Sequence, residues 1–230
     1  MKRACIVFAM LLLAHASSLQ AHDESSGWSF NLFTLEGLTL SDTVTFDAEI
    51  AERNGLDLPA YFRIRIPRDP RIERRIIPNP SGGALVGIVF SRGEDQTGTD
   101  ADLLELVQIT GARVPMQPEH DGQELSRVQA AGLLARDIVL PRMIADKEGA
   151  ELIDVSQFSV GEMQAAQVLA THLEPEIGPV LLRIVILPHP EQADGLMVVA
   201  KINLGLVPVE DNEMLTSTLS GRIISSWEYQ

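Results

Sequence analysis

The chain has 230 residues, with 18 basic and 32 acidic side chains and a formal net charge of −14. A surface this acidic repels nucleic-acid phosphates and anionic lipid headgroups, so the sequence predicts neither a nucleic acid nor a lipid surface as partner. The single cysteine and the scattered histidines offer no spacing typical of a metal centre.

The N-terminus has the pattern of a secretory signal peptide over residues 1–21. Lys2 and Arg3 precede an apolar run, Ala4 to Ala14, which is shorter than the ~20 apolar residues of a membrane span. Cleavage after Ala21 is favoured over cleavage after Ala16 because it leaves a polar mature start. An uncleaved anchor is the alternative interpretation. The sequence therefore predicts an exported protein, periplasmic or secreted.

Removal of this signal would change the mature chain in two ways. Loss of Lys2 and Arg3 takes the net charge from −14 to −16, and loss of Cys5 leaves no thiol. Disulfides, thiolate catalysis and cysteine metal sites are then excluded. Residues 22–230 contain no further apolar run of membrane-span length, and we expect them to form one α+β domain.

The first half of the mature chain has mostly strand patterns. Alternating or continuous apolar residues predict strands at 28–32, 44–48, 62–66, 84–90 and 103–109, the last favoured over a short helix. Asn54-Gly55 is a turn signal, and residues 93–100 indicate a polar loop. Residues 67–83 hold four prolines and predict a long loop.

The second half combines helices with long strands. Asp121 and Glu124 resemble a capping box, which predicts a helix over 122–139 that Pro141 ends or interrupts. Spacing of Leu215, Leu219 and Ile223 predicts a final helix, 209–227. The strands expected here are 150–158, 163–172 (or a short helix), 180–187 and 196–204.

The order of these elements resembles a known fold. The residues that carry the resemblance are 150–153, Val160-Gly161, 182–187, 197–200 and 224–227, with 27–30 as an opening strand. They resemble the fold shared by the PsbP extrinsic subunit of photosystem II and the periplasmic DcrB lipoprotein. The resemblance implies an antiparallel sheet packed with helices, an αβα sandwich, and a binding or assembly module rather than an enzyme. The long insert at 54–83 departs from the family, as does the lack of a lipid-attachment cysteine. No residues match the divalent-ion ligands of PsbP, so the resemblance implies no metal or cofactor.

Arginines gather in one short segment. Guanidinium groups bind carboxylates and phosphates through two parallel hydrogen bonds, so the segment predicts a docking surface for an acidic protein partner or an anionic ligand. The alternative is a solvated strand face paired with the protein's own acids. The residues are Arg63, Arg65, Arg68, Arg71, Arg74 and Arg75.

Other candidate ligands have weaker patterns. Five acidic residues could bind calcium, but their spacing does not match an EF-hand, and a solvated loop is the favoured interpretation. They are Glu94, Asp95, Asp100, Asp102 and Glu105. His22 at the new N-terminus could chelate copper with the α-amine, although a frayed terminus is favoured. The other mature histidines, His120, His172 and His189, form no metal-binding pair.

No catalytic motif is recognisable. The chain lacks a Gly-x-Ser-x-Gly elbow, and Ser220-Gly221 and Ser81-Gly82-Gly83 are typical of caps and turns. The function hypothesis is therefore an exported, non-catalytic binding, assembly or accessory protein of the bacterial envelope, without a cofactor. A periplasmic small-molecule or metal-binding protein and a hydrolase of unrecognised type are the alternatives.

Overall fold

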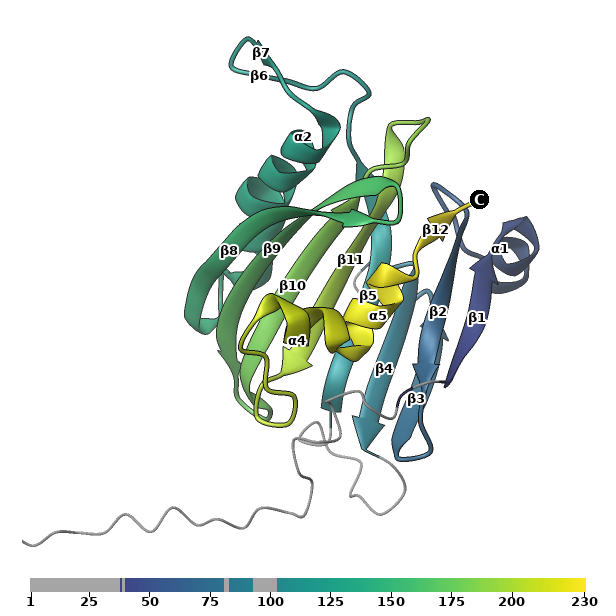
Figure 1. Cartoon of the computed structure of the whole chain (residues 1–230), viewed down its shortest axis with the longest axis vertical. Coiled ribbons are helices and arrows are strands. Elements are labelled where there is room, and N and C mark those ends of the chain that lie inside the picture. The colour runs from purple at the N-terminus through teal and green to yellow at the C-terminus, as the bar shows by residue number, and fades with distance from the viewer. Residues whose placement is uncertain (1–37, 39, 81–82, 93–102) are drawn as a thin grey trace, which may run out of the picture.

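The computed structural model describes residues 38, 40–80, 83–92 and 103–230 (Figure 1). The expected signal peptide, the strand at 28–32 and the polar loop at 93–100 lie outside these residues. No helix in the described ranges is long and apolar enough to cross a membrane.

A seven-stranded antiparallel sheet forms the body of the molecule, in the order β3-β4-β5-β11-β10-β9-β8 (Figure 1). Its strands are β3 (Ile72–Pro78), β4 (Val86–Arg92), β5 (Leu103–Arg113), β8 (Glu148–Val160), β9 (Met163–Glu174), β10 (Gly178–Leu187) and β11 (Asp194–Asn203). Strands β9, β10 and β11 follow one another as hairpins, whereas β11 pairs with β5 from much earlier in the chain. The α+β prediction with an antiparallel sheet is confirmed.

One face of this sheet is covered by a second layer of mixed structure. The layer contains a small sheet of β1 (Leu40–Phe46), β2 (Phe62–Arg68) and β12 (Glu228–Tyr229), with helices α1 (Ala48–Asn54), α4 (Asn212–Ser217) and α5 (Leu219–Ser225). The buried side of β2 joins α5 and the large sheet in the larger hydrophobic core. Phe62 stacks between Phe46 and Trp227, with ring centroids 4.6 and 4.5 Å apart.

The opposite face is covered by a single helical segment. It runs through α2 (Arg127–Leu133), the π-helix η3 (Leu134–Val139) and α3 (Leu140–Ile144). Ala131, Ala135 and Leu140 from this segment pack on side chains of β9 and β10 in a second, smaller core. Small alanines allow the helical segment to lie close to the sheet.

The predicted loop at 67–83 is wrong, because much of that segment is strand. Strand β2 continues through Pro67 to Arg68, and β3 pairs with β4. Pro67 is tolerated because β12 pairs only with Arg63 and Phe62, so the β2 edge at Pro67 has no described ladder partner. Pro78 is the last residue of β3, an edge strand where its missing N–H costs no hydrogen bond.

The predicted start and end of the helix at 122–139 are also wrong. Asp121 and Gly122, both with positive φ, form the turn of a small hairpin, β6 (Glu119–His120) and β7 (Gln123–Glu124). The true capping box pairs Ser126 with Gln129. Pro141 does not end the segment, because it is the second residue of α3, where a missing N–H is tolerated.

Two further elements differ from the sequence prediction. Asn54-Gly55 ends α1, a helix that the pattern did not predict, with Gly55 as a left-handed cap at φ 62°. The predicted final helix at 209–227 is two helices, because Thr218 has extended backbone and caps the end of α4 and the start of α5. A Cβ added at Gly221 would lie 2.3 Å from the Leu215 carbonyl oxygen, so this corner needs glycine. The segment at 163–172 is strand β9, which decides the alternative left open there.

Candidate functional site

The six candidate arginines lie on β2, on β3 and in the turn between them, and these two strands belong to different sheets. Arg63 and Arg65 project from the face of β2 opposite buried Phe62, Ile64 and Ile66, and Arg68 is the exposed last residue of the strand. Arg71 lies in the turn, and Arg74 and Arg75 lie on β3. The structure therefore brings all six to neighbouring positions.

Four of these arginines are paired with acids of the same chain. Arg63 pairs with Glu228 of β12, and Arg71 holds Asp69 with two hydrogen bonds, of 2.7 and 2.6 Å. Asp42 of β1 lies 2.7 Å from Arg74 Nη2 and 3.8 Å from Arg68 Nη1. The hydrogen bond from Arg74 lowers the pKa of Asp42, and that from Arg71 lowers the pKa of Asp69.

The remaining two arginines lack such partners. Among the described residues, neither Arg65 nor Arg75 has an ion pair. Both side chains belong to exposed residues. Their guanidinium groups are therefore accessible to an acidic group from another molecule.

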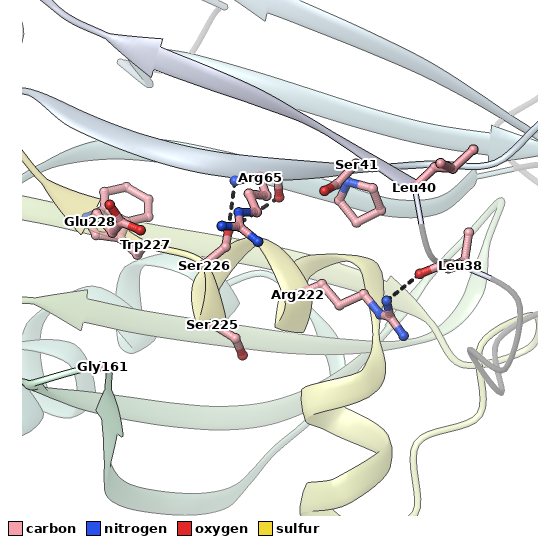
Figure 2. A pocket seen from close by; sticks show the side chains of 11 residues that line it. Leu38, Leu40, Ser41, Arg65, Gly161, Arg222, Ser225, Ser226, Trp227 and Glu228 are labelled. Carbon is pink, nitrogen blue, oxygen red and sulfur yellow. Dashed lines mark hydrogen bonds between the residues drawn. The ribbon is translucent and has the colours of Figure 1, made fainter.

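Arg65 lines a groove between the small sheet and α5 (Figure 2). The groove has a volume of about 510 Å³. A second arginine, Arg222, enters it from α5, and the polar residues that share the lining are Ser41, Ser225, Ser226 and Glu228. The Ser225 and Ser226 hydroxyls already donate to carbonyl oxygens of α5, and Glu228 adds one carboxylate to the lining. The two guanidinium groups are therefore the part of this depression suited to carboxylates or phosphates.

Backbone contacts hold the two sides of this groove in place. The backbone N–H of Arg65 donates to the Ser226 hydroxyl at 2.8 Å, which fastens the end of α5 to β2. Arg222 donates to the Leu38 carbonyl oxygen at 2.6 Å, and burial lowers its pKa (Figure 2). The backbone from which the Arg65 side chain projects is thus held against the end of α5.

The acidic stretch does not form one described site. Glu94, Asp95, Asp100 and Asp102 lie outside the described residues, and the prediction that Glu105 belongs to a solvated loop is wrong. Glu105 lies fully buried in β5, where its carboxylate accepts hydrogen bonds from Leu219 N at 2.7 Å and Ser220 N at 2.8 Å. Burial raises its pKa, while these bonds and Arg183 act in the opposite direction. Glu105 therefore anchors the first turn of α5.

Arg183 is the buried cation that faces this carboxylate. It donates from Nε to Gln167 at 3.1 Å and lies over the Phe158 ring, 5.5 Å from its centroid. Burial lowers the pKa of Arg183 to about 10, and the charge of Glu105 opposes that effect. These contacts join β5, β9 and β10 to the α4–α5 layer.

The histidines occupy three separate places. His172 is buried, with Nε2 3.1 Å from Glu174 Oε1, and Lys147 and Lys201 donate to the same carboxylate at 2.8 and 2.9 Å. His189 Nδ1 accepts from Glu191 N, and His120 lies beside Asp121. His22 is outside the described ranges. Within those ranges no group of three or more histidine, cysteine, aspartate or glutamate side chains could hold a metal ion.

The Glu174 cluster was not predicted from the sequence, because its members come from three elements. Burial raises the pKa of Glu174, but hydrogen bonds from Lys147, Lys201 and His172 outweigh burial and bring it to about 2. The contribution of Arg222 and Ser226 to the groove was missed for the same reason. Both lie in the segment 209–227, for which the sequence predicted one helix and no binding residues.

A second cavity, of about 280 Å³, lies between the β6–β7 hairpin and the α2–η3 segment. Its lining is mostly apolar, from residues such as Leu125, Leu133, Leu134 and Ile138. The small-molecule alternative would have its site here. Among the described residues, no histidine is hydrogen-bonded to a serine or threonine hydroxyl, the pair a serine hydrolase needs.

The chain is thus an α+β protein whose antiparallel sheet is covered on both faces, and it can be compared with known proteins on that basis. No protein-family model and no curated protein sequence matches the chain. Among solved structures, the chain is similar to a cyanobacterial PsbP (CyanoP) from Synechocystis sp. PCC 6803, with 13% identity and a TM-score of 0.46. That match covers 84% of this chain and 96% of the other. The PsbP-like resemblance seen in the sequence is found again here.

Two other solved structures are similar at the same level. LpqN, involved in cell envelope biogenesis of Mycobacterium tuberculosis, has 14% identity and a TM-score of 0.46, over 83% of this chain and 91% of LpqN. The Ran-binding protein Mog1p of Saccharomyces cerevisiae has 8% identity and a TM-score of 0.42, over 82% and 95%. We take no functional inference from similarities at these scores.

Proposed function

We propose that this chain is an exported, non-catalytic binding protein that serves as an assembly or accessory factor of the bacterial envelope. It docks an acidic segment of a protein partner through Arg65 and the arginines around it. The observation that carries this proposal is the exposed Arg65 guanidinium, which has no ion pair in the described structure and lies beside a groove with a second arginine.

The neighbouring ion pairs support the same interface. Arg63 with Glu228 and Arg68 with Asp42 are pairs between half-exposed or exposed side chains, which contribute about 0–1 kcal/mol each. A carboxylate of the partner can replace the internal acid at small cost. On a chain with a net charge of −14, this segment is where an acidic partner meets local positive charge.

The test compares two charge reversals on the mature chain. Arg65→Glu changes the groove, and Arg142→Glu is the matched control, because Arg142 is an exposed arginine of α3 on the opposite side of the large sheet. Proteins from an envelope extract are captured on each immobilised variant and quantified. The partner is then purified, and its affinity is measured by calorimetry at two salt concentrations.

We expect the captured partner to be lost with Arg65→Glu and kept with Arg142→Glu, and its affinity to fall with salt. Equal recovery by both variants would exclude the arginine interface. Export is tested separately by N-terminal sequencing of protein from the periplasmic fraction, where the expected first residue is His22.

A further inference from the structure

The edge strand β8 is long and has a free side. It spans 13 residues, and among the described strands it pairs only with β9. The N–H and C=O groups on its outer side therefore have no ladder partner in the described structure. An exposed edge of this kind is a template for one more strand.

Apolar side chains on this edge are exposed. Leu152, Ile153 and Val155 are 45%, 55% and 40% exposed, and Leu173 of β9, the register partner of Glu148, is 45% exposed. The exposure arises because the α2–η3–α3 segment packs mainly on β9 and β10, and only its α2 part reaches β8, which is therefore covered only in part. A strand added to β8 would cover these side chains.

The charge of β8 defines the chemistry of its partner. Glu148, Glu151 and Asp154 lie along the strand, which contains no basic residue. Lys147 precedes it, but both its donor contacts go to Glu174. A second copy of β8 paired antiparallel about Glu151 would place Glu151 opposite itself and Glu148 opposite Asp154, which is destabilising.

We propose that β8 binds an extended segment of a partner protein in which apolar residues alternate with lysine or arginine. The segment adds to the sheet by backbone hydrogen bonds, its apolar side chains cover Val155 and Leu152, and its basic side chains face Glu151 and Asp154. This surface is separate from the arginine groove, and the proposal does not rest on the function proposed above.

Strand geometry limits the length of the docked segment. The pairing of β8 with β9 shifts between Glu148 and Glu151 and again between Leu152 and Asp154, whereas Asp154 to Val160 pairs without interruption. Bulges bend an edge and interrupt pairing. We therefore expect the ladder to form along 154–160, with the bulged part supplying side-chain contacts.

The opposite edge of the sheet supplies an internal control. Strand β3 is short, ends at Pro78 and carries Arg74 and Arg75. A basic segment is repelled by those arginines, so it should choose β8 over β3.

The experiment uses the full mature chain and a synthetic peptide of seven alternating lysine and valine residues. Hydrogen exchange measured by mass spectrometry locates the bound peptide, and fluorescence anisotropy measures its affinity. A matched peptide with alternate amides N-methylated keeps its charge and side chains but cannot form the ladder. The protein variants are Glu151→Lys with Asp154→Lys, and, as an equal charge change elsewhere, Glu176→Lys with Glu191→Lys.

We expect slowed exchange within 148–160 and not within 72–78, no binding of the N-methylated peptide, and about tenfold weaker binding to the Glu151→Lys, Asp154→Lys variant. The control variant and Arg65→Glu should bind as the wild type does. Equal binding of the N-methylated peptide, or protection outside β8, would overturn the proposal. Concentration-dependent protection of β8 without peptide would also overturn it, because a second copy would then be the occupant.

Discussion

The two faces of the large sheet are covered in different ways. The small sheet with α4 and α5 forms a broad layer over one face, and its core extends from β3 and β4 to β9. The α2–η3–α3 segment covers the other face alone and reaches mainly β9 and β10. The broad layer is built of several pieces, whereas the narrow one is a single helical segment.

This difference explains where accessible surfaces arise. Where several elements make a layer, a groove forms at the seam between them, as it does between α5 and the small sheet. Where one helical segment is narrower than the sheet, an edge strand stays only partly covered, as β8 does. The two surfaces also differ in charge, arginine-rich at the seam and acidic at the edge.

Replacement of Glu105, which anchors α5 in the broad layer, should give the largest loss of stability. Glu105→Ala would leave two amides of α5 without an acceptor and would remove the negative charge that favours the charged form of buried Arg183. We expect the free energy of unfolding to fall by about 3–5 kcal/mol in urea denaturation. Glu105→Gln keeps an oxygen acceptor and should lose less. A loss below about 1 kcal/mol for Glu105→Ala would mean that this carboxylate does not hold the layer.

Replacement of Glu174, in the cluster with His172, Lys147 and Lys201, should give a smaller loss of stability that depends on pH. The pKa of Glu174 is about 2 in the folded chain, below its ordinary value of 4.5, so folding favours the ionised form. This stabilisation is fully present above about pH 4.5 and is lost as the pH falls towards 2. Its size is at most about 3 kcal/mol.

The measurement compares Glu174→Gln with the wild type by urea denaturation at pH 7, 4 and 2.5. The difference in unfolding free energy should shrink as the pH falls. Glu176→Gln, an exposed acid in the same turn, is the control and should match the wild type at each pH. A difference that stays constant with pH would contradict the assigned role of Glu174.

Two substitutions near the start of α2 test which residue caps this helix. Ser126→Ala removes the hydroxyl that accepts from Gln129 N and should cost about 1 kcal/mol, measured by thermal or urea unfolding. Glu124→Ala is the control, because Glu124 is exposed in β7 and belongs to the capping box predicted from the sequence. If Glu124→Ala were the more destabilising change, the cap predicted from the sequence would be the true one.

Substitution of an exposed side chain on the edge strand β8 should have the smallest effect on stability. Val155 and Val168 are register partners on β8 and β9, but Val155 is 40% exposed and Val168 is fully buried. Val155→Thr should change the unfolding free energy by no more than about 0.5 kcal/mol, whereas Val168→Thr should cost about 1–3 kcal/mol. Equal losses would indicate that β8 is covered in solution.

The sequence predicted the strands of the sheet centre well, and the reason is their burial. Strands β10 and β11 are apolar on both faces, so their continuous runs were recognised within two residues of the observed ends. Strand β3 was missed because prolines suggested a loop, although an edge strand tolerates them. The final helix was predicted as one because its apolar spacing continues through Thr218, where only the backbone changes.

The candidate site was predicted only in part. The six arginines were identified from their density in the sequence, and all six lie on β2, β3 and the turn between them. Their acidic partners could not be predicted, since Asp42 and Glu228 come from other strands and carry no local signal. That Arg65 belongs to a groove depends on α5, which reaches β2 from the far end of the chain.

The corner at Thr218 and Gly221 has a consequence for the evolution of this chain. Any side chain at position 221 would collide with the carbonyl oxygens of Leu215 and Thr216, so α4 and α5 could not both keep their places. In a library that samples every amino acid at each position, we expect glycine alone to survive selection for folded protein at this codon. Sequences descended from a common ancestor with this chain should therefore keep glycine at position 221.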